Sequence, residues 1–294
     1  MKHNNALGQI SFLIKLLTDR DEFVRNRVQE QLIDLGEDAL PFLEIAVRGG
    51  DDDLRIQANT VIQSILPQKL AEKFRQLAQK GLGQDIDLET GMMLIMEFGY
   101  PNSDPEEFRQ KLDELAQNFA DILNPEAEPP EIVAAFTHFL FQQKGFKGNK
   151  DDYQNPDNSF LNKVLDNQTG LPITLSAICV LLAKRLNLPI VGVGMPGHYI
   201  VKYSLPIEPI YFDPFHQGRL LTKKECIQIV EQFGHSFEEH FLSQATQRET
   251  LIRMLNNLIQ VYKKSNETKK AESLAGYIKI LLNPSKDQQS ERIH

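Results

Sequence analysis

Two residues of this sequence have the types and spacing of a catalytic pair, His198 and Asp213. His198 follows a Gly-Met-Pro-Gly segment at the start of one predicted strand, and Asp213 ends the next predicted strand. A simple antiparallel hairpin that turns between Leu205 and Pro206 places His198 directly opposite Asp213. Their side chains then share one face of the hairpin.

A histidine held by an aspartate is two-thirds of a nucleophilic triad. The carboxylate fixes the tautomer of the imidazole, and the imidazole serves as the base for a nucleophile. The alternative is structural: His198 packs in a turn, and Asp213 caps the turn that follows it. These two residues by themselves leave both interpretations open.

A third residue, His216, adds another candidate ligand to the pair. Two imidazoles and one carboxylate suit zinc or iron. Such a trio also arises by coincidence, with His216 simply exposed. Metal binding through His198, Asp213 and His216 is therefore kept as an alternative, while the first interpretation involves no cofactor and no metal.

The elements that must position these residues are mostly helical. The chain has 294 residues, 41% of them hydrophobic, which is enough for about two domains with a sizeable core. Residues 1–150 are predicted to be helical. Within residues 8–66 the similar segments Asp21–Gln29 and Asp52–Thr60 each follow another amphipathic helix. Helix pairs at a fixed period resemble HEAT repeats.

Residues 151–240 show a different pattern. A long apolar helix begins near Ile173, and three short β-branched segments follow it. Such segments predict antiparallel strands; they cover Ile190–Val193, His198–Tyr203 and Ile210–Asp213. This part of the chain is predicted to be an α+β core.

Residues 241–294 return to helices. Two helices are predicted, Thr250–Lys264 and Lys269–Leu282, and Pro284 ends the second. A hairpin of this kind resembles one tetratricopeptide unit. The whole chain is therefore expected to be α+β and predominantly helical.

The segment from Gly170 to Phe215 resembles the transglutaminase-like core. The helix end Ala183–Pro189, the Gly-His-Tyr beginning at Gly197 and the Asp-Pro at Asp213 carry the resemblance. Four longer phrases resemble the bacterial SirB family: N-P-D-N-S-F-L-N, G-L-P-I-T-L-S, G-V-G-M-P-G-H and F-D-P-F-H-Q-G-R-L-L. The resemblance implies a papain-like core followed by a tetratricopeptide segment.

The sequence departs from this family at the nucleophile. In the transglutaminase-like superfamily a cysteine begins the core helix, and alignment backwards from Arg185 places it at Ile173. Thr174 has a hydroxyl near the helix start, but a threonine needs strong activation by a base. Cys179 and Cys226 lie on apolar helix faces and are predicted to be buried thiols rather than nucleophiles.

Three functions follow from this departure. The first is a non-catalytic transglutaminase-like protein, an interaction or regulatory module whose groove is lined by Asn158, Ile173 and Tyr199. The second is a hydrolase or acyl-transferase that combines the His-Asp pair with Thr174 or an activated water. The third is the metal-binding alternative. The first interpretation predicts a protein partner.

The charge and the remaining motifs exclude other classes of function. A net charge of −8 disfavours binding to nucleic acid or to a membrane surface. The N-terminus has no secretory signal pattern, and no apolar run is long enough to span a bilayer. Phosphate-binding glycine motifs are absent from the sequence. These features predict a cytoplasmic protein.

Overall fold

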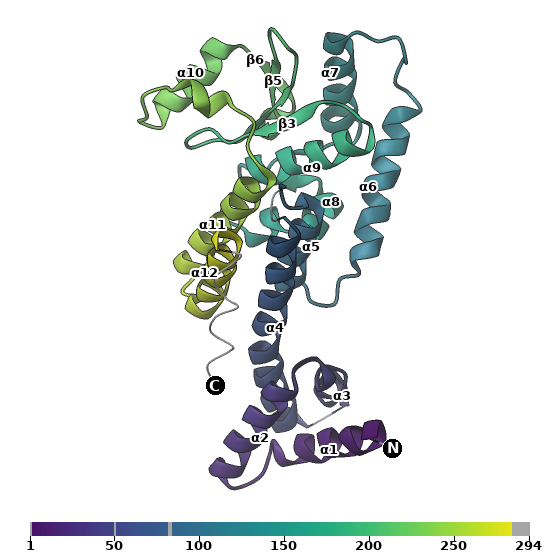
Figure 1. The fold of residues 1–294 in the computed structure, drawn as a ribbon, viewed down its shortest axis with the longest axis vertical. Coiled ribbons are helices and arrows are strands. Elements are labelled where there is room, and N and C mark those ends of the chain that lie inside the picture. Colours follow the sequence, from purple (N-terminus) through teal and green to yellow (C-terminus); the bar gives the residue numbers. More distant parts are fainter. Residues whose placement is uncertain (1, 50, 82–83, 284–294) are drawn as a thin grey trace. The chain divides into compact units, whose positions relative to one another are not determined.

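The computed structural model describes residues 2–49, 51–81 and 84–283 (Figure 1). The chain divides into two compact units, Met1–Lys73 and Phe74–His294. The predicted boundaries near residues 150 and 240 fall inside the second unit, because helices from both sides of each boundary pack on one core helix. Residues 284–294, and with them Pro284, lie outside the described residues.

The first unit consists of helices. They are α1 (Lys2–Leu16), α2 (Glu22–Leu35), α3 (Leu40–Gly49) and the start of α4 (Asp52–Lys80). Asp21 caps α2 by accepting a hydrogen bond from the backbone N–H of Phe23. Leu17, Leu32 and Leu43 are fully buried in the core of this unit. The helices therefore pair around a small core of their own.

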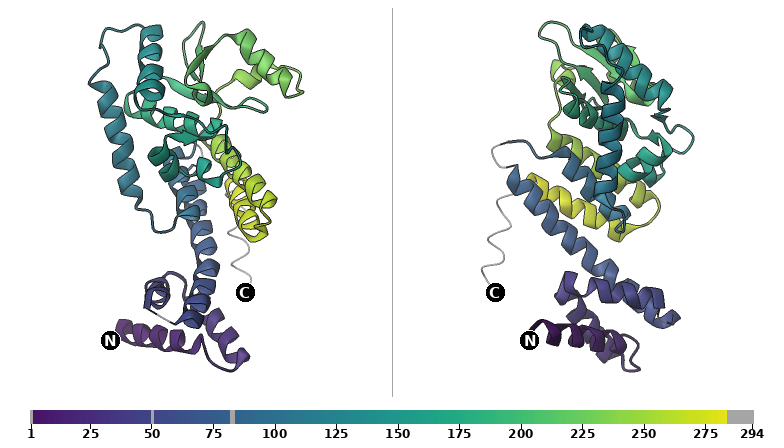
Figure 2. Two further views of the ribbon diagram at one scale, coloured as in Figure 1. Left: turned by 180° about the vertical axis from the view of Figure 1, so that it is seen from behind. Right: turned by 90° about the vertical axis from the view of Figure 1, so that its right-hand side faces the viewer.

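The second unit contains the remaining helices, with α4 entering it from the first. Their bounds are α5 (Leu88–Gly99), α6 (Pro105–Ala120), α7 (Pro129–Thr137), α8 (Leu161–Asn167), α9 (Pro172–Arg185), α10 (Lys223–Gln232), α11 (Gln247–Lys264) and α12 (Thr268–Leu282). Helices α11 and α12 lie side by side in Figure 1 and in the left view of Figure 2. None of the described helices is both long and apolar enough to cross a membrane.

Helix α9 is the core helix of this unit. It is apolar on every side, so its sequence fits a helix that is covered all round. Pro172 occupies its first turn, where a missing N–H costs nothing. At its other end, Arg185 forms a bidentate ion pair with Glu89 of α5 and a hydrogen bond of 2.6 Å to Asp113 of α6.

Four antiparallel strands follow α9 in consecutive order. They are β3 (Ile190–Val193), β4 (Ile200–Tyr203), β5 (Ile210–Asp213) and β6 (Arg219–Leu221). The first three were predicted, although β4 begins after His198. Two parallel two-residue strands, β1 (Lys147–Gly148) and β2 (Thr169–Gly170), were not predicted.

The predicted register of the β4–β5 hairpin is wrong by two positions. Val201 lies opposite Phe212, so the turn is centred after Pro206 rather than before it. Side-chain directions repeat every two residues along a strand, and a shift of two therefore keeps each side chain on its original face. His198 and Asp213 still meet, as diagonal neighbours rather than as a directly opposed pair.

Candidate functional site

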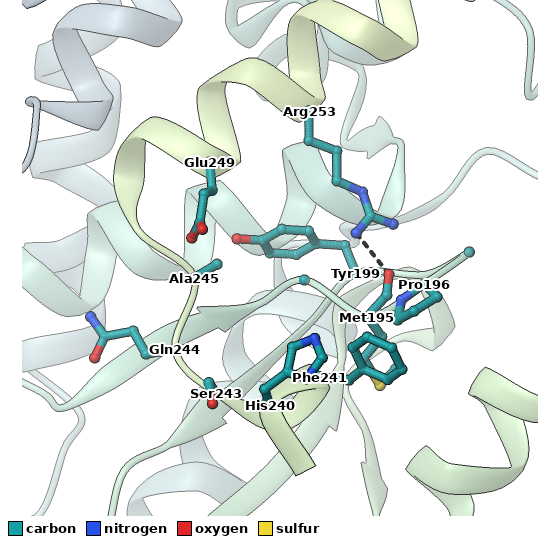
Figure 3. A pocket seen from close by; sticks show the side chains of 12 residues that line it. Met195, Pro196, Tyr199, His240, Phe241, Ser243, Gln244, Ala245, Glu249 and Arg253 are labelled. Carbon is teal, nitrogen blue, oxygen red and sulfur yellow. Dashed lines mark hydrogen bonds between the residues drawn. The ribbon is translucent and has the colours of Figure 1, made fainter. Parts of the chain in front are cut away.

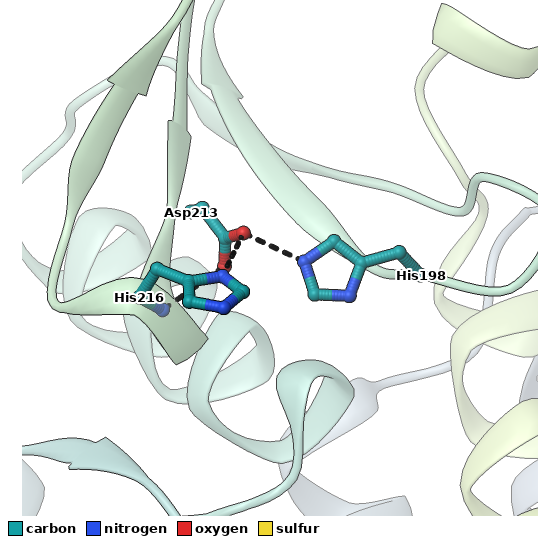
Figure 4. A group of neighbouring side chains, drawn as sticks. All are labelled: His198, Asp213 and His216. Carbon is teal, nitrogen blue, oxygen red and sulfur yellow. Dashed lines mark hydrogen bonds and ion pairs between the residues drawn. The ribbon is translucent and has the colours of Figure 1, made fainter. Parts of the chain in front are cut away.

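Three side chains, those of His198, Asp213 and His216, meet at the open end of the β4–β5 hairpin, the end away from its turn (Figure 4). Nε2 of His198 lies 2.7 Å from Oδ2 of Asp213, and Nδ1 of His216 lies 2.8 Å from the same oxygen. Both distances are those of good hydrogen bonds to a carboxylate. The structure thus brings together the three residues that the sequence offered as a catalytic pair and as candidate metal ligands.

The two carboxylate oxygens of Asp213 have different partners. Oδ2 accepts from the two imidazoles, while Oδ1 accepts from the backbone N–H groups of Phe215 (3.0 Å) and His216 (3.3 Å). Asp213 therefore caps the short 3₁₀ turn that follows it and also holds His198. Asp213 thus makes the capping hydrogen bonds of the structural interpretation and also the contact with His198 that the catalytic interpretation requires.

Asp213 is buried, with 2% of its surface exposed. Burial by itself raises the pKa of its carboxyl group. The hydrogen bonds and charge interactions with His198 and His216 outweigh burial and leave the pKa of Asp213 below its ordinary value. The carboxylate form is thus the one that this environment stabilises.

The loop that carries His198 is held from α11. Arg253 donates hydrogen bonds to the carbonyl oxygens of Met195 (2.7 Å) and His198 (3.0 Å), and the first of these is drawn in Figure 3. The backbone N–H of His198 bonds to the carbonyl of Met195. Gly197 has a φ of +75°, a conformation that favours glycine. The imidazole is therefore presented by a constrained loop.

His198, Asp213 and His216 line a pocket of about 650 Å³. Aromatic rings of Tyr153, Phe215 and Phe233 form part of its wall, and the ion pair between Arg219 and Glu225 forms another part. Such a mixture of aromatic surface and a few convergent polar groups is typical of a ligand site. None of the residues that line this pocket is a serine, a threonine or a cysteine.

The predicted nucleophile does not reach this pocket. Thr174 is fully buried, and its Oγ1 has no hydrogen-bond partner among the described residues. Ser176 is also fully buried. Pro172 is the residue of α9 that lines the pocket. The helix start is present, but its side chains with hydroxyl groups point into the protein.

The residues expected to line the groove lie elsewhere. Asn158 is buried, and its side chain bonds to Asn149 and to the carbonyl of Asp152. Ile173 is a buried core residue. Tyr199 lines a different pocket, of about 540 Å³ (Figure 3). Its hydroxyl lies 2.7 Å from Oγ1 of Thr250. Tyr199 and His198 are thus adjacent in sequence but line different pockets.

Both cysteines are buried, as the sequence predicted. Burial raises the pKa of the Cys179 thiol far above its ordinary value and raises the pKa of Cys226 to about 12. A thiol needs a lowered pKa to act as a nucleophile at neutral pH. Neither cysteine lines the pocket beside His198.

Several residues of the site were not singled out from the sequence. Phe215 lies inside the quoted F-D-P-F-H phrase, so its position next to Asp213 was a usable signal. Arg253 lies in α11 and Phe233 directly follows α10, and no local pattern marks either residue. Only tertiary packing shows that α11 supports the His198 loop and that α10 forms a pocket wall.

Comparisons with known proteins agree with this core. Residues 106–256, about half of the chain, match the family model described as Transglutaminase-like superfamily. A UPF0162 protein of Xylella fastidiosa (strain 9a5c) is 33% identical over 66% of this chain and 72% of its own length. F-box only protein 21 of Homo sapiens is 28% identical over 54% of this chain and 26% of its own length. No solved structure matches this chain.

Proposed function

Because this chain belongs to the transglutaminase-like superfamily, we propose that it is a non-catalytic member that binds a segment of a partner protein in the pocket beside His198. One observation carries the proposal: no thiol or aliphatic hydroxyl of the described residues lines the pocket that the His-Asp pair faces. The pocket and the paired imidazole remain, while the group that forms the covalent bond is missing. The proposed role of the protein is then to recognise a partner segment, in the cytoplasm.

The lining of the pocket supports a polypeptide ligand. The aromatic rings of Tyr153, Phe215 and Phe233 offer apolar surface for a side chain, and Gln228 and Gln232 of α10 offer amide groups for a peptide backbone. Figure 4 shows the imidazoles of His198 and His216 on either side of Asp213. They add polar contacts and do not need to react for a ligand to be held.

The finer family assignment belongs to the same proposal. The quoted phrases support the SirB family within the superfamily, and the paired helices of the first unit support a HEAT-like segment. The α11–α12 hairpin supports a tetratricopeptide-like unit. Repeats of these two kinds commonly bind other proteins, which agrees with an interaction role.

The absence of covalent chemistry can be tested with p-nitrophenyl acetate, an acylating probe, and iodoacetamide, an alkylating one. We expect the native protein to keep its mass with both probes at pH 8, and to gain two carbamidomethyl groups only after unfolding, one for each cysteine. Acylation of the native wild type that disappears in His198→Ala would instead favour the hydrolase alternative.

Partner binding can be tested by photo-crosslinking in cells. Phe233 is half-exposed at the pocket, so a benzoylphenylalanine there should crosslink one partner segment, identified by mass spectrometry. The same group at Lys224, exposed on the same helix but outside the pocket, is the matched control. We expect Gln228→Trp, which fills the pocket, to abolish the crosslink and His198→Ala to retain it. Equal crosslinking from both positions would contradict the proposal.

A second candidate, a hydrolase that uses activated water, has one observation in its favour. Nε2 of His198 is engaged by Asp213, whereas Nδ1 makes no hydrogen bond with any described residue. In the tautomer that this hydrogen bond implies, Nδ1 is unprotonated and can accept a proton from water. The same acylating probe and a panel of peptide amides distinguish this candidate, because it requires turnover that is lost in His198→Ala.

A further inference from the structure

We propose that His198, Asp213 and His216 form a binding site for one divalent transition-metal ion, with Zn²⁺ as the ion of best fit. One ligand atom from each residue lies within 4.8 Å of the other two. Two imidazole nitrogens and one carboxylate oxygen are a typical zinc donor set. This inference does not rest on the proposed function, because it concerns binding of the ion alone.

The carboxylate is prepared for such a role. Oδ1 of Asp213 is engaged by the backbone N–H groups of Phe215 and His216, so Oδ2 alone is directed at the two imidazoles. Hydrogen bonds to the second oxygen of a ligating carboxylate orient it and are a regular feature of metal sites. Asp213 would therefore bind through one oxygen.

The two histidines differ in solvent exposure, and the exposed one leaves a path by which an ion can enter the site. His198 is 8% exposed, and its loop is held by Arg253. His216 has 46% of its side chain exposed. Tetrahedral bonds of about 2.0–2.1 Å put ligand atoms about 3.3–3.4 Å apart, so the two N···O separations must widen by about half an ångström. Rotation of the exposed His216 ring supplies the change on its side, and a small shift of the His198 or Asp213 side chain supplies the other.

Charge also favours a cation here. Asp213 is buried, and the nearest fixed cation of the pocket, Arg219, is paired with Glu225. Imidazole and backbone N–H groups meet the negative charge of the carboxylate, and no lysine or arginine of the described residues is paired with it. A divalent ion takes the place of the imidazole N–H protons, each neutral imidazole then carries its proton on its other ring nitrogen, and the carboxylate neutralises part of the charge of the ion.

The pocket leaves room for a fourth ligand. Three protein ligands and an opening of about 650 Å³ are the arrangement of a metal site that takes water or a ligand atom in its last position. A carboxylate or thiolate from a bound segment is the chemical class that fits that position.

The test uses the full chain, freed of metal by a chelator and dialysed, with Zn²⁺ as the probe in isothermal titration calorimetry at pH 7.5. We expect one ion per chain, and we expect His216→Ala to weaken binding by about 100-fold or more, since even indirect partners of a metal contribute about 10- to 100-fold. His235→Ala, an exposed histidine outside the cluster, is the matched control and should leave the affinity unchanged.

A spectroscopic readout covers the case in which a variant folds poorly. Co²⁺ added to the metal-free wild type should give the intense visible bands of a tetrahedral site, and one equivalent of Zn²⁺ should remove them. No binding by the folded wild type, or equal affinities of wild type and His216→Ala, would overturn the inference. The photo-crosslink at Phe233 is measured with and without chelator, so a failed metal site and a failed partner site give separate results.

Discussion

Asp213 shows how one side chain can serve structure and chemistry together. One oxygen caps the turn after β5, and the other holds two imidazoles. Removing the carboxylate therefore disturbs the local backbone as well as the site, and the Asp213→Ala variant cannot separate the two roles. His216→Ala leaves the cap in place, because that cap uses the backbone N–H of His216 rather than its ring.

Gly197 provides a prediction at the residue scale. Its φ is +75°, and a Cβ built on it would lie 2.1 Å from the ring of Phe233. We expect Gly197→Ala to lower the free energy of unfolding by about 1–3 kcal/mol, from backbone strain together with the clash. The measurement is urea unfolding followed by circular dichroism.

The clash and the strain can be separated with a second variant. A Phe233→Ala background lacks the ring. Gly197→Ala should therefore lower the free energy of unfolding by less there than in the wild type, because only the backbone strain remains. Equal costs in both backgrounds would show that the ring moves away freely, and that the glycine is needed for its φ alone.

At the scale of elements, α9 organises the second unit. It packs against α6, β3 and β4, and its start contributes Pro172 to the pocket. Ion pairs tie its C-terminal end to α5 and α6 through Arg185, and Lys184 lies 2.9 Å from Asp87, the cap of α5. The position of the pocket thus depends on how α9 is held between helices that precede it by many residues.

The N-terminus of the core helix gives a prediction about the missing nucleophile. Pro172→Cys places a thiol in the pocket at a helix start, where the helix dipole and a nearby imidazole lower its pKa. We expect iodoacetamide to alkylate this thiol in the native protein, about tenfold more slowly when His198→Ala is added. Ile173→Cys is the control and should stay unlabelled, because residue 173 is buried.

Asp87 gives a prediction with a pH dependence. It caps α5 through Thr90 and pairs with Lys184. Burial raises the pKa of Asp87, but its hydrogen bonds with Lys184 and Thr90 and the charge of Lys184 lower the pKa by more. The net pKa therefore lies below the ordinary value. The stabilisation is therefore present above the unfolded-state pKa of about 4 and is lost as the pH falls through the folded-state pKa.

Two substitutions at this position separate the cap from the charge. Asp87→Asn keeps a capping side chain and loses the ion pair, while Asp87→Ala loses both and should cost about 1 kcal/mol more. In urea unfolding at pH 6.5 the wild type should have a higher free energy of unfolding than Asp87→Asn, and this difference should be smaller at pH 3. A difference in free energy of unfolding that is as large at pH 3 as at pH 6.5 would mean that the charge of the Asp87 carboxylate is not the source of the stabilisation.

At the scale of the whole molecule, the chain has two compact units with separate cores. Each core can unfold as its own cooperative group, so unfolding is expected to depart from a single two-state transition. The candidate site lies entirely in the second unit. Its ligand binding should therefore shift only the transition of that unit.

Core truncations in each unit test this expectation. Leu32 and Ile178 are both fully buried, one in each unit, and each substitution to alanine should cost about 2–5 kcal/mol. Hydrogen exchange read by mass spectrometry should show Leu32→Ala loosening the first unit and Ile178→Ala the second. Loosening of both units by either variant would show that the two cores unfold as one.

Much of the site was predictable from the chain because its determinants are local. A continuous apolar run indicated α9, and β-branched segments indicated three of the four strands of the sheet. The Gly-His and Asp-Pro phrases identified His198 and Asp213. A register error of two residues did not separate the pair, because strand faces repeat with that period.

The tertiary structure decided what the pair faces. Whether Thr174, Ile173 or Pro172 reaches the pocket depends on the rotation of α9 about its own axis, and neighbouring residues of a helix point about 100° apart. The support from Arg253 and the wall formed by α10 come from packing between segments distant in sequence. Local patterns thus indicated which residues form the candidate site, and only long-range packing determined that no serine, threonine or cysteine among the described residues lines its pocket.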